Sequence, residues 1–483
     1  MAISRSAFRS RPRRLDLAAA APDSSKSPRP GLATRLFGSP QFVKLLVAQI
    51  VSATGDWLGL LATIALATRL GSESPGLAVG GALSARVLPG FFFAPVAGVL
   101  VDRWDRKKVM VRCDLGRAAV LCFLPFVDSL VGLVLASLLL EAFTLLWQPA
   151  KEASVPHLVS QDKLTTANSL SLAAAYGTFP LAAGLFGLLS KVSDWFGNGW
   201  FMQALNLHQE GLGFYADAFT FLLSATLVWR LTLPRPRRTS SGAPGKAGAI
   251  GPDGRRVADP WAPFRELAEG WQFIAGNSVV KAVILGLGTG LIGGGMLVPL
   301  GPLFLHDVLG AGSAGFGLFT FVLGLGVASG VLALTALQRK LQKKAAFTAC
   351  VFGAGACLFC AASTTTLTPA AVFVGGVGVC AGAVYVLGFT LLHESVDDEL
   401  RGRIFAALYT LVRLCVLIAF SAGPLVSELL SAVSDRFGGE VSPIGFDIAI
   451  PGVRLTMWLA ALIILGAGLL SLRILSRGRA AGR

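Results

Sequence analysis

The sequence predicts an all-α membrane protein in which twelve transmembrane helices form two pseudo-symmetric bundles of six. The first observation is composition: 54% of the 483 residues are hydrophobic and 14% are charged, whereas soluble domains carry about 25% charged residues. The second is a series of apolar runs near the length of about 20 residues that crosses a bilayer. The third is one long polar segment that leaves six apolar runs on each side of it.

Five segments follow in order along the chain. The first is rich in Arg, Ser, Ala and Pro and lacks an apolar core, which excludes a cleaved secretory signal. A plastid transit peptide has the same composition, so a plastid envelope remains open beside the expected bacterial plasma membrane. The predicted segments are a disordered basic cytoplasmic tail (1–40), an N-terminal six-helix bundle (41–233), a cytoplasmic linker (234–278), a C-terminal six-helix bundle (279–476) and a cytoplasmic tail (477–483).

The predicted spans are defined by their apolar runs. The second, for example, has about 25 residues and would be roughly 37 Å long as a helix, enough to cross a bilayer with some tilt. Boundaries read in this way are good to a few residues. The spans lie near 41–69, 77–101, 109–130, 131–150, 166–190, 212–233, 279–305, 314–337, 345–362, 369–392, 403–430 and 453–475.

Basic residues fall on one side of the predicted membrane. They crowd the tails and the loop after every second span, whereas the alternate loops hold few. Because basic loops remain in the cytoplasm, this distribution places both termini there and supports the count of twelve spans. The net charge of +15 therefore reflects orientation in a lipid bilayer. We expect no nucleic-acid partner, and we expect a monomer.

Related sequences occur at the same place in each half. Glu-Ala-Ser-Val precedes the fifth span and Glu-Ser-Val precedes the eleventh, which suggests a duplicated unit. Small residues and prolines follow in both spans, and such residues allow close helix packing and bending. The residues expected to pack or bend these helices are Gly177, Pro180, Gly184, Gly423 and Pro424.

The turn between the second and third spans carries a charged motif. It reads Gly-Val-Leu-Val-Asp-Arg-Trp-Asp-Arg-Lys over 98–107. This resembles motif A of the major facilitator superfamily, G-x-L-[AS]-D-R-[FWY]-[GD]-R-[RK]. Asp105 departs from the Gly found in most of that family. Together with the Arg86-Val-Leu-Pro89 lead-in, it resembles the branch that includes the enterobactin exporter and macrolide efflux proteins.

The resemblance implies alternating access, with the two bundles rocking about a midplane site. Asp102 ends a helix, where a lone carboxylate is unfavourable beside the negative end of the helix dipole. In the family the matching Asp contacts the start of the eleventh span and latches the outward-open state, so we expect this role for Asp102. Asp114 and Arg117 are three residues apart and can pair on one helix face. The expected latch residues are Gly98, Asp102, Arg103, Arg106, Lys107, Asp114 and Arg117.

Several charges fall inside the apolar spans. A charge at the centre of a membrane helix costs about 3 kcal/mol on insertion scales, so it normally faces a cavity or a partner. Asp56 is the first candidate for a proton-carrying carboxyl, and Glu141 is the second. Arg86 and Arg413 either bind an anionic group or pair with those acids. Static ion pairs that only hold helices together remain an alternative for all four, and Asp217 is placed near the outer end of the sixth span.

The function predicted from these features is secondary active transport, with proton-coupled export of an amphiphilic or drug-like small molecule. A lipid or lysophospholipid flippase on the same fold remains an alternative. So does a non-transporting receptor, in which Asp56, Glu141 and Arg413 would be sealed in ion pairs. The sequence has no phosphate-binding Gly-x-x-x-x-Gly-Lys-Ser/Thr loop and no clustered metal ligands. We therefore expect no enzyme activity, metal or cofactor, and a proton gradient as the energy source.

Overall fold

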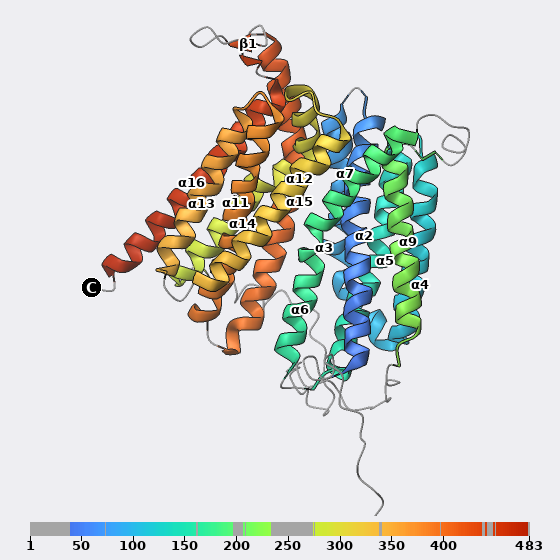
Figure 1. Ribbon diagram of the computed structural model, residues 1–483. Coiled ribbons are helices and arrows are strands. Elements are labelled where there is room, and N and C mark those ends of the chain that lie inside the picture. The colour runs from blue at the N-terminus through green and yellow to red at the C-terminus, as the bar shows by residue number, and fades with distance from the viewer. Residues whose placement is uncertain are drawn as a thin grey trace, which may run out of the picture.

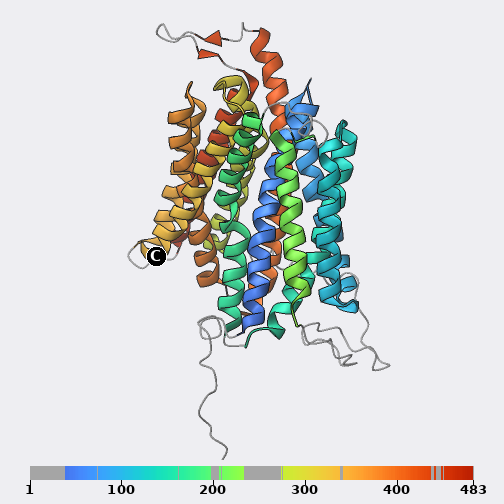
Figure 2. The ribbon, with the colours of Figure 1, turned by 45° about the vertical axis from the view of Figure 1, so that its right-hand side comes forward.

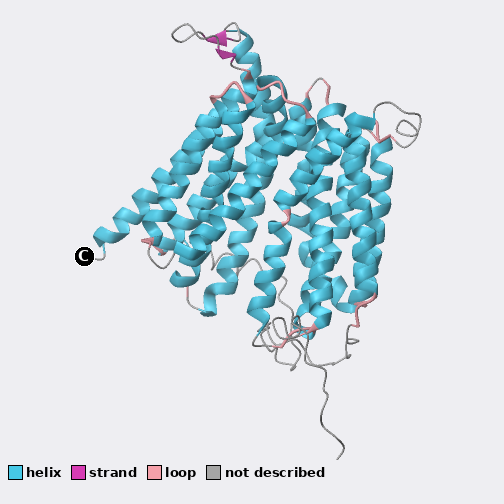
Figure 3. Cartoon of the chain, in the orientation of Figure 1, coloured by secondary structure: helices cyan, strands magenta, loops and turns pink. Residues whose placement is uncertain are grey.

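A computed structural model shows two helical bundles side by side (Figure 1). It describes residues 39–481, with gaps at 73, 161–162, 197–205, 208, 233–273, 275, 338–340, 397, 437–439, 442–447 and 450. The described chain is almost entirely helical (Figure 3). Its described strands are the short antiparallel pair β1 (Glu440–Val441) and β2 (Ile448–Ala449).

The N-terminal bundle is coloured blue to green in Figure 1. Several of its helices begin at recognisable caps. The Ser39 side chain accepts a hydrogen bond at the start of the first helix, and Ser129 does so at the start of the fourth span. A side-chain oxygen at this position satisfies a backbone N–H that has no partner within the helix. The elements are α2 (Pro40–Leu70), α3 (Pro75–Arg103), α4 (Arg106–Phe123), η1 (Leu124–Phe126), α5 (Leu130–Ser154), η2 (Val155–His157), α6 (Leu164–Gly177), α7 (Phe179–Phe196) and α9 (Gln209–Trp229).

The C-terminal bundle is coloured yellow to red. Asn277 caps its first helix by accepting from the N–H groups of Val279 and Val280. The far end of α15 and the strand pair project beyond the other helices (Figures 1 and 2). The elements are α11 (Ser278–Leu303), η4 (Phe304–Val308), α12 (Ser313–Leu337), α13 (Lys343–Ala362), α14 (Leu367–Ser395), α15 (Asp398–Arg436) and α16 (Gly452–Ala481).

The predicted all-α membrane fold is confirmed. Among the described residues, eleven segments are long and apolar enough to cross a membrane. The twelfth is α4, which packs between α5 and α9 but carries Arg112, Asp114 and Arg117 within 18 residues. Several predicted boundaries were wrong. The third span ends at Phe123, well before 130, because the turn lies at 127–129. The eleventh is extended at both ends, to Asp398–Arg436.

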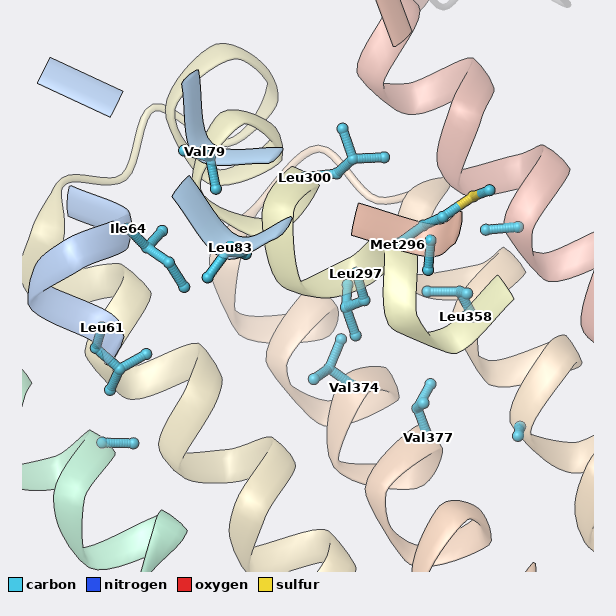
Figure 4. Close-up of a cluster of buried hydrophobic side chains, with 14 of the residues drawn as sticks. Leu61, Ile64, Val79, Leu83, Met296, Leu297, Leu300, Leu358, Val374 and Val377 are labelled. Atoms are coloured by element: carbon cyan, nitrogen blue, oxygen red, sulfur yellow. The ribbon is translucent and has the colours of Figure 1, made fainter. Parts of the chain in front are cut away.

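The two bundles share an apolar core on one side of the molecule. We call the side with the turn at 104–105 the basic side, and the side with the turn at 71–72 the opposite side. Near the opposite side, residues of α2 and α3 pack in one buried cluster with residues of α11 and α14 (Figure 4). A second buried cluster, which contains Phe42, Val109 and Trp147, is built from residues of the N-terminal bundle. The described apolar contact between bundles is therefore strongest away from the basic side.

The fifth span is interrupted. It consists of α6 and α7, with a turn at Thr178 between them. Pro180 lies in the first turn of α7, where its missing N–H is tolerated. On one side of the break, α6 is tied to α2: Gln49 Nε2 donates to Ser171 O at 2.7 Å, and Trp57 Nε1 donates to Ala175 O at 2.8 Å. On the other side, α7 packs against α12 of the C-terminal bundle.

Candidate functional site

A network of charged side chains runs through the middle of the N-terminal bundle. Arg117, on α4, has Nη2 only 2.5 Å from Asp114 Oδ1 and Nη1 3.7 Å from Asp56 Oδ1. Ser224 Oγ, on α9, donates to the other oxygen of Asp114 at 2.9 Å. Three helices thus contribute to one network. The predicted Asp114–Arg117 pairing is present, but the pair lies at membrane depth beside Asp56.

Arg117 is a fixed charge in this network. Its side chain is 2% exposed, and its guanidinium lies 4.1 Å from the ring centre of Phe221 and 5.3 Å from that of Trp147. Aromatic faces attract guanidinium groups, and more strongly when water is excluded. Asp56 differs, since its side chain is 37% exposed. The network therefore joins a buried end to a partly exposed acidic end.

A second charged group joins the two bundles. Arg413, on α15 of the C-terminal bundle, donates from Nη1 to Gly90 O on α3 at 2.9 Å. A Cβ atom placed on Gly90 would lie 3.3 Å from Glu141 Oε1 and 3.7 Å from Arg413 Nη1. The absence of a side chain at Gly90 thus lets Glu141 and Arg413 approach from different bundles. Within the described residues Glu141 makes no ion pair.

Arg86 lies among these groups. It interacts electrostatically with Asp56, Glu141 and Asp217. Both Arg86 and Glu141 are partly exposed, and Arg413 is exposed. The four membrane-depth charges predicted from the sequence therefore belong to one region that contacts both bundles. This arrangement can bind a charged solute, move a proton, or do both. It does not resemble a set of sealed ion pairs, because Asp56, Arg86 and Glu141 are partly exposed and Arg413 is exposed.

Asp217 was placed wrongly by the sequence analysis. It does not lie near the end of its span but eight residues into α9, where its side chain is 2% exposed and packs against Gly55 and Gly59 of α2. The sequence contained one usable signal, because glycines four residues apart in a membrane helix mark a close helix contact. No sequence feature showed that the contact would be with a carboxyl group.

The charged turn at 104–105 contains a cap that the sequence analysis missed. The Asp105 side chain accepts hydrogen bonds from the N–H groups of Lys107 and Lys108 and so begins α4. Arg106 Nη1 donates to Ala153 O, and Lys107 Nζ donates to Leu231 O, both at 2.8 Å. These bonds tie the turn to the ends of α5 and α9. The side chains of Asp102 and Arg103 and the surroundings of Gly98 lie outside the described residues, so the latch remains a prediction.

Most of the predicted packing residues lie at contacts between helices. A Cβ on Gly184 would lie 3.2 Å from the Phe321 ring of α12, and one on Gly423 would lie 3.1 Å from Met296 of α11. Pro424 packs against Gly80 of α3, 2.9 Å from the position of a Cβ there. Gly177 has open space at its Cβ and precedes the break at Thr178. Gly184, Gly423 and Pro424 thus lie where helices meet, whereas Gly177 does not.

Comparison with known proteins decides the family. The family model described as Major Facilitator Superfamily matches residues 45–420, which is most of the chain. The chain belongs to the major facilitator superfamily. It is therefore a membrane transporter, and the predicted absence of an enzyme activity agrees with this family.

Several facilitator relatives are similar over different lengths. An uncharacterized MFS-type transporter of Mycobacterium tuberculosis is 28% identical over 388 residues, which cover 76% of this chain and 80% of that protein. An uncharacterized MFS-type transporter of Bacillus subtilis is 25% identical over 379 residues, or 76% of this chain and 81% of that protein. Macrolide efflux protein A of Enterococcus faecalis is 36% identical over 110 residues, which cover 22% of this chain and 34% of that protein.

Solved facilitator structures share the fold. A bacterial homologue of the human lysosomal transporter Spinster, in an inward-facing and unoccupied conformation, aligns with a TM-score of 0.67 at 16% identity, covering 90% of this chain and 97% of that one. The nucleoside transporter NupG aligns with a TM-score of 0.62 at 13% identity, covering 90% and 99%. At such low identity the likeness shows the fold alone.

Proposed function

We propose that this protein is a proton-coupled exporter of amphiphilic small molecules that works by alternating access. It acts as a monomer in a bacterial plasma membrane, with both termini in the cytoplasm and a proton gradient as its energy source. Asp56 and Glu141 carry protons, Arg86 and Arg413 face the transported molecule, and Asp102 latches the outward-open conformation.

One observation carries the proposal: Arg413 of one bundle reaches Gly90 of the other beside Glu141. A charge buried in a membrane is expensive, and it is retained where it serves a pathway or a partner. Here the charge lies where the two bundles meet, so any rocking of the bundles changes its surroundings. Since Asp56 is partly exposed and interacts electrostatically with Arg86 and Glu141, protonation and bundle movement act on the same group of side chains.

The position of the contacts between bundles supports alternating access. From the opposite side toward the middle of the membrane, α3 and α15 touch at Gly80 and Pro424, then at Ser84 and Ser421, and then at Gly90 and Arg413. This line of contacts closes one side of the site. Reaching the other conformation requires these contacts to separate while the basic side, with its charged turn, closes.

Export is supported by the macrolide efflux relative, whose similarity covers 22% of this chain. The position of the charges argues against a receptor without transport. That alternative requires Asp56, Glu141 and Arg413 to be sealed in ion pairs, whereas Asp56 is 37% exposed and Arg413 is exposed.

The test uses efflux-deficient bacteria loaded with a panel of fluorescent amphiphiles. Cells that express the wild type should accumulate less dye than cells with an empty vector, and a proton uncoupler should abolish the difference. Asp56→Asn should accumulate as much dye as the empty vector. Equal accumulation in every strain would rule out export for that panel, and lipid translocation in proteoliposomes would then be measured.

A matched control separates coupling from a general effect of losing an acid. Glu394 pairs with Lys343 at the end of α14, and its side chain is 51% exposed. Exposed ion pairs contribute about 0–1 kcal/mol. Glu394→Gln should therefore leave efflux unchanged, with expression equal to that of Asp56→Asn on immunoblots. Loss of efflux in both variants would remove the case for Asp56.

A further inference from the structure

A second carboxyl group of the N-terminal bundle is completely enclosed. Asp217 is 2% exposed and lies between α9 and α2. A Cβ on Gly55 would come within 2.2 Å of its Oδ1, and one on Gly59 within 2.1 Å of its Oδ2. Each carboxyl oxygen therefore occupies the space that a side chain on α2 would need. The two glycines form a recess that holds this carboxyl group and, beside Gly55, the Thr220 hydroxyl.

Asp217 makes no ion pair with any of the described residues. The contrast is Glu210, two turns earlier on the same face of α9, which is 2.5 Å from the Arg69 guanidinium of α2. Both acids face the same neighbouring helix, and one has an arginine where the other has glycine. Burying an unpaired carboxylate is so costly that such a group normally becomes neutral instead.

The hydroxyl next to Asp217 fits a neutral acid. Thr220 Oγ1 donates to the backbone O of Asp217 at 2.8 Å and lies 3.3 Å from Oδ1. A hydroxyl group has a single hydrogen but can also accept. When that hydrogen is on the carbonyl, as the shorter distance favours, Thr220 has none left for Oδ1, and a hydrogen bond between Oγ1 and Oδ1 then needs a proton on the carboxyl group.

The charged groups around Asp217 come from three helices. Asp56 on α2 repels its ionised form, whereas Arg86 on α3 and Arg117 on α4 attract it. Arg117 already pairs with Asp114 at 2.5 Å. The ionisable residues of α7, which also packs against α9, lie near the far end of that helix, at 191 and 194. Asp56 directly follows Gly55 of the recess, and its side chain is partly exposed.

We propose that Asp217 is a second proton-carrying group of this transporter, and that it exchanges its proton with water through Asp56. In the exchange, the O–H bond of Asp217 breaks and an O–H bond forms on the Asp56 carboxylate, so one proton moves and no other reactant is needed. The proposal rests on the proposed role of Asp56 in proton coupling. It adds a protonatable site inside the bundle, so that a cycle can move two protons.

Infrared spectroscopy of the full-length protein in lipid tests this without any substrate. A neutral carboxylic acid has a carbonyl stretch that an ionised carboxylate lacks. We expect such a band in the wild type, its loss in Asp217→Asn, a shift in Asp217→Glu, and no change in Glu210→Gln. On transfer to D2O, the Asp217 band should shift with time, and Asp56→Asn should slow that shift.

Each outcome bears on the proposal. If Asp217→Asn has the same bands as the wild type, Asp217 is ionised and the proposal fails. If the band exchanges equally fast in Asp56→Asn, the route does not pass through Asp56. A band that disappears when Na⁺ replaces choline would make the recess a sodium site instead. If Asp217→Asn does not fold, the shift in Asp217→Glu still decides. If Asp56→Asn loses dye efflux but the wild type shows no Asp217 band, the proposed export is supported and the role of Asp217 fails.

Discussion

Glycines serve different purposes in the two bundles. In the C-terminal bundle, a Cβ on Gly378 of α14 would lie 2.2 Å from the backbone O of Leu323, and one on Gly330 of α12 would lie 2.1 Å from the backbone O of Val379. There glycine lets one backbone lie on another. In the N-terminal bundle, the atoms nearest Gly59 belong to the Asp217 side chain, and the nearest to Gly90 belongs to Glu141.

The two bundles have the same number of spans, but their glycines support different features: close helix packing in one and ionisable side chains in the other. Backbone-on-backbone contact makes α12 and α14 a rigid pair. Glycines that face carboxyl groups instead make space for ionisable side chains inside a membrane bundle, where such groups are otherwise expelled. The N-terminal bundle therefore holds most of the described membrane-depth charges, and the C-terminal bundle contributes Arg413 to them.

The largest effect is expected where backbone blocks the new side chain. In Gly378→Ala the added methyl group meets the Leu323 carbonyl and cannot be avoided without moving a helix. Overpacking of this kind costs about 1–3 kcal/mol, so the midpoint of thermal unfolding in detergent should fall. Gly466→Ala, with no atom within 4 Å of its Cβ position, should not lower it. Equal midpoints would contradict the close contact of α12 with α14.

A smaller and reversible effect is expected at Gly59. The methyl group of Gly59→Ala meets Asp217 Oδ2, the end of a side chain that can rotate. The double variant Gly59→Ala with Asp217→Ala removes the two nearest atoms and leaves the Asp217 Cβ at 3.6 Å, which is an ordinary contact. Its unfolding midpoint should return toward that of Asp217→Ala alone. If the second substitution gives no rescue, the blocking atoms are not those of the side chain.

Arg413 tests whether the C-terminal bundle takes part in the charged site. A hydrogen bond to a charged group contributes about 1.5–3 kcal/mol, so Arg413→Gln should weaken the bond to Gly90 and shift the balance of conformations. Spin labels at positions 164 and 398, in a cysteine-free background, would report the shift as a changed distance distribution. Ser421→Ala removes a neutral hydrogen bond to Ser84, at 3.0 Å, from the same line of contacts between α3 and α15. This variant should change the distance distribution less. The reverse ranking would count against Arg413.

The smallest effect is expected at the cap of α4. Asp105→Ala removes the acceptor for two N–H groups, which costs about 1 kcal/mol, whereas Gly at a cap costs only a few tenths relative to Asp. Unfolding midpoints should therefore rank wild type, then Asp105→Gly, then Asp105→Ala. An Ala variant as stable as the Gly variant would show that the Asp105 side chain contributes nothing.

The depth of Asp56, Arg86, Glu141 and Arg413 could be predicted from the sequence because each lies well inside an apolar run. The partners of these residues could not, because they depend on the rotation of each helix about its axis and on which helices touch. Arg117 shows this: its pairing with Asp114 follows from spacing, but its approach to Asp56 depends on how α2 and α4 are placed around α9. The Asp105 cap was predictable, since an acceptor directly before a helix is a known start signal.

The break at Thr178 has a mechanical consequence. The two parts of this span have different partners: α6 is tied to α2 through Gln49 and Trp57, while α7 packs against α12 of the other bundle as well as against α2 and α9 of its own. An unbroken helix tied in this way would resist any rotation of one bundle against the other as a stiff rod does. Because the helix is interrupted beside Pro180, which has no backbone N–H to leave unpaired, the span can bend at this point. It can therefore keep its contacts with both bundles while the bundles move between conformations.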